Sequence, residues 1–133
     1  MIKCDVCNKE YQKKWYKNNA AAHKQKISIN RKKSKQENRD YIYNFLSNSC
    51  CNTCGEKDIL VLEFDHKNPQ QKSFDLGRAH MKKNLTIKEL VKEIAKCVVR
   101  CGNCHKITTQ QEQNTWRWQK VNATKAKEST NLL

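Results

Sequence analysis

The chain contains the stretch Cys51-Asn52-Thr53-Cys54-Gly55, in which two residues separate the thiols and a glycine suited to a tight turn follows. The same cysteine spacing returns in Cys101-Gly102-Asn103-Cys104. Each stretch can fold as a knuckle that presents two thiolates, and two such knuckles complete a tetrahedral shell around one zinc ion. The sequence thus predicts a structural zinc, because a closed shell leaves no open position for catalysis. Its ligands would be Cys51, Cys54, Cys101 and Cys104.

Four other cysteines lie outside these two knuckles. Cys50 and Cys97 are close to them but at spacings longer than the common knuckle, so we interpret both as buried thiols near the zinc. Cys4-Asp5-Val6-Cys7 is a third knuckle without a partner pair, and Cys4 and Cys7 are candidate ligands of a second zinc. That site would need His23 with Cys50 or Cys97, or ligands from a second chain. Otherwise the stretch is half of a zinc finger.

The cysteines are expected to serve as metal ligands and free thiols. No apolar run follows the first residues, as a signal peptide would require, and no apolar stretch reaches the length of a membrane span. These features predict a cytoplasmic protein without membrane association, in a reducing compartment where closely spaced cysteines bind metals. The alternative is a secreted chain whose eight cysteines form disulfides.

A strong positive charge is the main feature of the composition. The 133 residues include 27 Lys and Arg against 13 Asp and Glu, a formal net charge of +14. Such an excess attracts polyanions, so we expect a nucleic acid as the partner. A cationic protein that binds a membrane surface is the alternative. With 37% hydrophobic residues, the chain can build one modest core that a metal site would help to stabilise.

The pattern of residues predicts three segments. Residues 1–46 form a basic, mostly helical extension, because they hold no Gly or Pro and few apolar positions. Such a polar helix would lie on a partner or project into solvent. Residues 47–120 form the working domain, in which the chain after the second knuckle is compatible with a helix to about Trp118. Residues 121–133 are a polar tail that is expected to fray.

Two short strands are predicted between the knuckles. Ile59–Phe64 is apolar and ends at Asp65-His66, which is typical of a buried strand. Val98–Arg100 is β-branched and enters the second knuckle. The polar residues 67–83 are expected to form a loop.

A helix is predicted between the loop and the second strand. Thr86 is followed three residues later by Glu89, the pattern of a capping box, and the helix would run over about residues 87–96. Its inward face would hold Ile87, Leu90, Val91 and Ile94. The fold class is therefore a small α+β domain.

Asp65, His66 and His105 are the residues that suit phosphodiester hydrolysis. That reaction needs a base that takes a proton from water, and positive charge near the leaving oxygen. A neutral imidazole can be the base near pH 7, while a carboxylate and a second imidazole can ligate one divalent ion. Closing the two knuckles around zinc brings His105 towards the Asp-His pair. The other histidines, His23 and His80, have no motif context and are interpreted as ordinary polar residues.

The ordered combination of these motifs resembles the HNH endonucleases of phages and mobile elements. It comprises C-x-x-C-G, then Leu62-Glu63-Phe64-Asp65-His66-Lys67-Asn68-Pro69, then C-x-N-C-H, over about residues 47–110. The resemblance implies a ββα-metal core with the Asp-His pair on the first strand and the last His on the helix. It implies that Asp65 and His105 hold a catalytic Mg²⁺ or Mn²⁺, with other divalent ions as alternatives. It further implies His66 as general base and products with 5′-phosphate ends.

The chain departs from this family at two places. Lys96 occupies the usual position of the middle Asn, which helps to orient the base. Asn103 is the first substitute and is counted among the catalytic candidates, while Asn84 is the second. Thr108 and Thr109 stand where the family often has Lys-Thr or another His, so the resemblance assigns no third protein ligand.

Lysines and arginines in two places are predicted to bind DNA phosphates. One group lies at helical spacing in the N-terminal extension, and the other lies in the loop beside the proposed site. They are Arg31, Lys32, Lys33, Lys35, Arg39, Lys72, Arg78, Lys82 and Lys83. We expect double-stranded DNA as the partner. A homodimer would let a chain with one catalytic centre cut both strands.

Two other functions are alternatives. One is a zinc-dependent nucleic-acid-binding protein without activity, although such a protein would need neither the Asp-His pair nor the last His. The other is an accessory nuclease subunit of a phage packaging machine, whose cleavage depends on its partners. Homing, restriction, killing and packaging all use such a module, and the motif does not choose among these roles.

Overall fold

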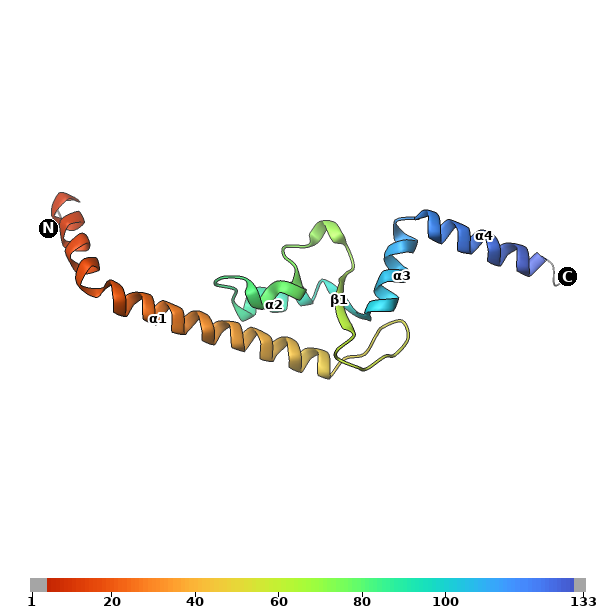
Figure 1. Ribbon diagram of the computed structural model, residues 1–133, viewed down its shortest axis with the longest axis horizontal. Coiled ribbons are helices and arrows are strands. Elements are labelled where there is room, and N and C mark those ends of the chain that lie inside the picture. Colours follow the sequence, from red (N-terminus) through yellow and green to blue (C-terminus); the bar gives the residue numbers. More distant parts are fainter. Residues whose placement is uncertain (1–4, 131–133) are drawn as a thin grey trace.

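The computed structural model describes the backbone of residues 5–130 and the side chains of residues 8–126. It confirms a small α+β fold in which helices flank a two-stranded sheet (Figure 1). The elements in order are α1 (Asp5–Ser47), β1 (Leu62–His66), the 3₁₀ helices η1 (Pro69–Gln71) and η2 (Leu76–Met81), α2 (Ile87–Ile94), β2 (Cys97–Cys101), α3 (Gly102–Glu112) and α4 (Trp116–Thr130).

The sheet pairs the two strands that the sequence predicted, in an antiparallel register. Leu62 lies opposite Cys101, and His66 lies opposite Cys97. The first strand begins later than predicted, because residues before Leu62 form a turn in which Asp58 accepts the backbone N–H groups of Leu60 and Val61. The strand also ends later than predicted, so Asp65 and His66 belong to it.

Helix α1 confirms the predicted helical extension and has two distinct parts. Its first two thirds project from the sheet region, and the helix bends near its N-terminal end (Figure 1). Its last turns pack on the core: Leu46 is buried, and the side chain of Asn38 donates to the carbonyl of Leu85 at 3.1 Å. Polar sequence at the start and apolar residues at the end therefore divide the helix into an exposed arm and an anchored base.

Two small clusters of buried residues form the core. One lies under η2 and α2, and its members are Leu76, Ala79, Leu85, Leu90 and Ile94. The other lies between the end of α1 and the knuckles, and its members are Leu46, Cys51, Leu62 and Cys101. Ile42 and Phe64 pack against both clusters and connect them. Two of the four buried members of the second cluster are knuckle cysteines, so the knuckles are part of the core.

Helix α2 confirms the capping box and corrects its predicted inward face. Thr86 accepts the backbone N–H of Glu89, whose side chain in turn accepts the N–H of Thr86. Leu90 and Ile94 are buried as predicted, but Val91 is 40% exposed. Glu93 is buried instead. A carboxylate ordinarily stays on the outer face of a helix, and the partners of Glu93 explain why it lies inside.

The chain after the second knuckle is divided into two helices. Asn114 adopts a left-handed conformation with φ of 45°, which interrupts the helix that was predicted to run to Trp118. The hydroxyl of Thr115 accepts the N–H of Trp118 and so caps α4. The segment predicted as a frayed tail continues α4 to Thr130. The stretch 67–83, predicted as loop, contains the two 3₁₀ helices.

Candidate functional site

The four knuckle cysteines form one cluster, as the sequence predicted. The Sγ atoms of Cys51, Cys54, Cys101 and Cys104 all lie within 4.8 Å of one another, and this group could hold a metal ion. Cys54 Sγ is 3.7 Å from Cys101 Sγ. A tetrahedral zinc with bonds of about 2.3 Å has sulfur atoms about 3.8 Å apart, so the spacing fits zinc.

The local backbone explains why the knuckles meet. Gly55 has φ of 78°, a left-handed conformation that closes the first turn through its N–H to the Cys51 carbonyl. Asn52 donates its N–H to the carbonyl of Val99 at 2.8 Å, which joins the first knuckle to β2. Cys101 is the last residue of β2 and caps α3, so the second knuckle is the turn from strand to helix.

The thiols of the cluster differ in their pKa values. Burial raises the pKa of Cys51, but backbone N–H groups of the two knuckles outweigh it and lower the pKa to about 6. The neighbouring Cys101 thiol and burial raise the pKa of Cys104 to about 12. Four thiolates this close repel one another, and a bound zinc would remove that repulsion.

The remaining cysteines stand apart from this cluster. Cys50 is exposed, so its interpretation as a buried thiol is wrong. The Cys97 thiol is partly buried and donates to the carbonyl of Glu93 at 3.5 Å. Burial raises the pKa of Cys97 to about 11, so it is a protonated structural thiol. Cys4 lies outside the described residues. Cys7 lies in α1, but its side chain is outside the described part, so the predicted second zinc site stays a prediction.

Asp65 and His105 come together on one face of the sheet. His105, on the first turn of α3, places Nε2 3.4 Å from Oδ1 of Asp65. Its other ring nitrogen, Nδ1, donates to Oε2 of Glu63 at 2.8 Å. Arg100 of β2 pairs with the second oxygen of Asp65, Oδ2. Strand alternation places Glu63 and Asp65 on the same face, and this signal could have identified Glu63 from the sequence.

His66 occupies the opposite face of β1. Its side chain is 9% exposed, and Nε2 lies 2.9 Å from Oε1 of Glu93. The three predicted catalytic residues are thus divided: Asp65 and His105 make one pair, while His66 is held separately at the last position of the strand. Alternation along β1 is the physical cause.

The residues considered in place of the family's middle Asn take different positions. Asn103 is exposed on α3 and lines a surface hollow between α3 and α4 with Trp118. Asn84 adopts a left-handed conformation with φ of 58° before α2. Lys96 reaches inward, and its Nζ donates to Oε2 of Glu93 at 2.7 Å. Of these three residues, only Lys96 contacts the partner of His66.

The hollow beside His105 contains acidic residues to which the sequence analysis gave no role. Glu63, Asp75, His80 and His105 line it together with apolar residues of α1, β1 and η2. His80 comes from η2, in the inserted segment. Thr109, considered as a source of a further ligand, donates its hydroxyl to the carbonyl of His105 at 3.0 Å and so braces α3.

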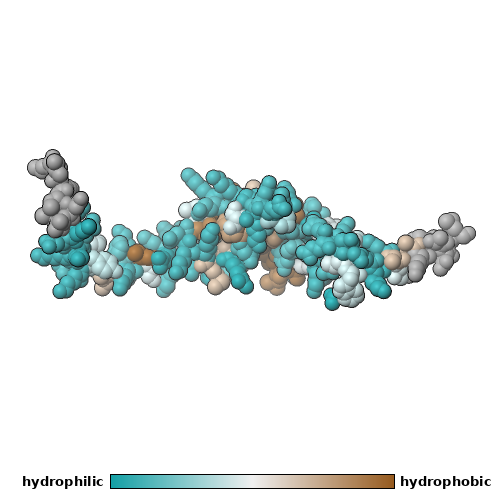
Figure 2. Space-filling model, turned by 90° about the horizontal axis from the view of Figure 1, so that it is seen from above, coloured by the Kyte–Doolittle hydropathy of each residue, from teal (hydrophilic) through white to brown (hydrophobic). Residues whose placement is uncertain are grey.

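The basic residues predicted to bind DNA are brought together only in part. Arg31 and Lys35 of α1 line one groove with Lys82 and Lys83, which follow η2. Lys32 lies next to this group on α1, and Lys33 pairs with Glu37 at 3.9 Å. The others are exposed elsewhere on the surface, namely Arg39, Lys72 and Arg78. Hydrophilic residues cover most of the visible face in Figure 2.

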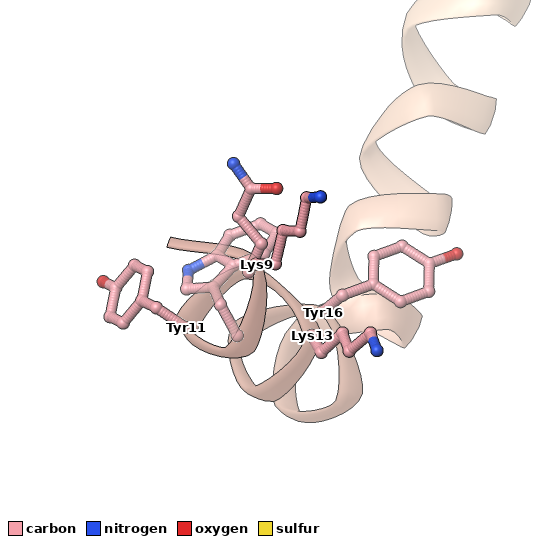
Figure 3. A pocket seen from close by; sticks show the side chains of 6 residues that line it. Lys9, Tyr11, Lys13 and Tyr16 are labelled. Carbon is pink, nitrogen blue, oxygen red and sulfur yellow. The ribbon is translucent and has the colours of Figure 1, made fainter. Parts of the chain in front are cut away.

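The bent end of α1 carries a group of exposed aromatic side chains. Tyr11, Trp15 and Tyr16 line a shallow hollow with Lys9 and Lys13 (Figure 3). Tyr11 is 69% exposed. Asn19 donates its side-chain N–H to the carbonyl of Trp15 at 2.8 Å. This group lies at the far end of α1 from the sheet and is separate from the histidine sites (Figure 1).

Comparison with known proteins gives no relative from which to transfer a role. No family model matches the chain, and no curated protein or solved structure is significantly similar to it. No helix in the described part of the chain combines the length and the apolar character of a membrane span.

Proposed function

We propose that the protein is a metal-dependent DNA endonuclease of the HNH type, which hydrolyses phosphodiester bonds beside a structural zinc. The observation that carries the proposal is the 3.4 Å approach of His105 Nε2 to Asp65 Oδ1. The order of β1, β2 and α3, joined by the cysteine cluster, agrees with the ββα-metal core that the resemblance implies.

The Asp65–His105 pair has the donor set and spacing of an open site for a divalent ion. Two ligands about 2.1 Å from an ion and about 90–110° apart are separated by about 3.0–3.4 Å. Glu63 accepts the Nδ1–H of His105, and the neutral ring would then offer Nε2 to an ion bound beside Asp65. Arg100 pairs with Oδ2 of Asp65 and leaves Oδ1 on the side of His105.

In the proposed reaction, a bound divalent ion would polarise the scissile phosphate and stabilise the departing 3′ oxygen. His66 would take the proton of the attacking water, and the product would carry a 5′-phosphate. Asp65 and His105 would hold the ion from one face of β1. Because His66 is the last residue of this strand, the proposal places the scissile phosphate at the strand end, within reach of both faces.

The charge distribution supports a nucleic acid as the substrate. The groove that contains Arg31, Lys35, Lys82 and Lys83 lies between α1 and the segment that enters α2. Phosphates bound there would hold a duplex without reading its sequence. The net charge of +14 would speed the encounter and make affinity dependent on salt.

Two contacts favour a second candidate, a nucleic-acid-binding module that contains the structural zinc and has no activity. Asp65 is already paired with Arg100, and His66 is largely buried against Glu93. In that case these side chains would stabilise the fold, and the basic groove would be the functional surface. An accessory subunit that cuts only with a packaging partner is a variant of the first proposal.

Incubation with supercoiled plasmid separates these candidates. We expect nicking or linearisation in Mg²⁺ or Mn²⁺, none in EDTA, and loss of cleavage in His66→Ala. His23→Ala is the matched control, since His23 is exposed on α1 and contacts the ring of Trp15. Binding without cleavage by the zinc-loaded wild type, in either metal, would support the binding module. Recovery of cleavage on adding a partner would identify the accessory subunit.

A further inference from the structure

The carboxylate of Glu93 is the most deeply buried charge among the described residues. It lies on α2 between two buried apolar positions, and only 2% of its side chain is exposed. Its Oε1 accepts the backbone N–H of Ser73 at 2.7 Å and faces His66 Nε2 at 2.9 Å. Its Oε2 accepts Nζ of Lys96 at 2.7 Å. Every side of this carboxylate therefore has a donor.

A buried carboxylate is costly unless its partners compensate for the lost water. Burial raises the pKa of Glu93, but hydrogen bonds from Lys96, from the Ser73 N–H and from His66 outweigh it and lower the pKa to about 2. Glu93 is therefore an anion at neutral pH.

An ionised carboxylate can only accept hydrogen bonds. The ring nitrogen that faces Glu93 must therefore carry a hydrogen, and His66 is the Nε2–H tautomer when neutral. Its lone pair is then on Nδ1. Among the described residues, Nδ1 of His66 has no hydrogen-bond partner. It is also absent from their buried polar atoms that lack a partner, so it is in reach of solvent.

We propose that Glu93 is the positioning residue for His66, which holds the ring with Nδ1 as the proton acceptor. This inference rests on the proposed function. When Nδ1 takes a proton from the attacking water, the water becomes hydroxide and the ring becomes imidazolium. Its Nε2–H stays on the Glu93 carboxylate, which stabilises the new positive charge.

Lys96 completes the arrangement. Its Nζ also donates to the carbonyl of Gln71 at 3.0 Å and to the hydroxyl of Ser73 at 2.8 Å. These contacts fix the segment after β1 to the end of α2. The backbone N–H of Lys67, next to His66, donates to the carbonyl of Lys96 at 3.1 Å. The ring of His66 and its carboxylate partner are thus held by one network.

The first test needs only the wild-type protein. Nitrogen-15 NMR of the imidazole rings distinguishes the two neutral tautomers and does not depend on catalysis. The signals of His66 are identified by their loss in His66→Ala. We expect the Nε2–H tautomer to dominate for His66. A dominant Nδ1–H tautomer would overturn the proposal, whether or not the protein cuts DNA.

The second test is Glu93→Gln, in which the side-chain amide can donate to Nε2. We expect a shift of His66 towards the Nδ1–H tautomer, and plasmid cleavage slower by about a hundredfold or more. Glu89→Gln is the matched control, because it changes an exposed carboxylate of the same helix and weakens only the helix cap. Zinc content shows whether each variant is folded.

The outcomes are separable. A folded, zinc-loaded Glu93→Gln that cuts at the wild-type rate contradicts the role of Glu93 while the proposed function stands. A wild type that never cuts DNA contradicts the proposed function, and the proposed catalytic role of Glu93 fails with it. The wild-type tautomer still decides whether Glu93 sets the orientation of His66. If Glu93→Gln does not fold, that same measurement remains decisive.

Discussion

His105 Nε2 lies 3.4 Å from Asp65 Oδ1, and the opposite nitrogen of the same ring donates to Glu63 at 2.8 Å. One imidazole is therefore oriented by a carboxylate on one side and directed at a second carboxylate on the other. Metal-binding histidines commonly have this arrangement, in which the distal nitrogen is fixed by an acceptor. Glu63 therefore has a role that a substitution can test.

Replacement of Glu63 should weaken binding of the catalytic ion. In Glu63→Gln the acceptor of the His105 Nδ1–H becomes a weaker, neutral one, so the ring is held less firmly. We expect the Mn²⁺ concentration for half-maximal cleavage to rise by about 10- to 100-fold. Glu112→Gln, at the exposed end of α3, should leave it unchanged. Equal Mn²⁺ dependence in the two variants would remove Glu63 from the site.

The cysteine cluster should bind one zinc that the fold requires. Cys104→Ser removes a ligand, and we expect loss of zinc and a fall in Tm of more than about 10 °C. Cys50→Ser changes a neighbouring exposed thiol outside the cluster and should retain both zinc and Tm. Metal analysis and thermal unfolding check this prediction, which is wrong if Cys50→Ser loses as much zinc as Cys104→Ser.

The groove between α1 and the residues after η2 should contribute to the salt dependence of DNA binding. Each lysine that neutralises a phosphate adds about one unit to the slope of log affinity against log salt concentration. The double variant Lys82→Ala, Lys83→Ala should reduce that slope by about two for any duplex sequence. The control is the double variant Lys57→Ala, Lys120→Ala, which removes two exposed lysines outside the groove. An equal loss of slope in both would indicate nonspecific charge alone.

The ionised Glu93 should make part of the stability dependent on pH. Its pKa is lowered from 4.5 to about 2, so the folded state favours the anion. The contribution to the free energy of unfolding is complete above about pH 4.5 and is lost as the pH falls towards 2. We expect the stability difference between wild type and Glu93→Gln to shrink as the pH falls below about 4.5. Denaturant unfolding in excess zinc measures this, and a constant difference down to pH 3 would be contrary to it.

The sequence was sufficient where the determinants are local. The capping box at Thr86 and Glu89 lies within one helical turn, and the knuckle at Cys51 and Cys54 within one tight turn with Gly55. Because tetrahedral zinc needs four ligands and each knuckle supplies two, the second knuckle is expected to lie beside the first. These features predicted α2, the cysteine cluster and the approach of His105 to β1.

The partners of the histidines could not be found in the same way. Glu93 lies 27 positions from His66, and its charge predicts an outer position on α2. Only the network with Lys96 and the segment after β1 makes its burial favourable. Asp65 and His66 lie on opposite faces because side chains alternate along a strand. Predicting this from the sequence requires knowing that β1 extends through His66.

The most direct test of the central claim compares the zinc-loaded wild type with Asp65→Ala and His105→Ala on an end-labelled DNA duplex in Mn²⁺. The account predicts metal-dependent cleavage by the wild type to products that a ligase can rejoin through their 5′-phosphates. Both variants should bind the duplex but cut at least about a hundredfold more slowly. A wild type that binds without cutting, or an Asp65→Ala variant that cuts at the wild-type rate, would contradict a catalytic ion held by Asp65 and His105.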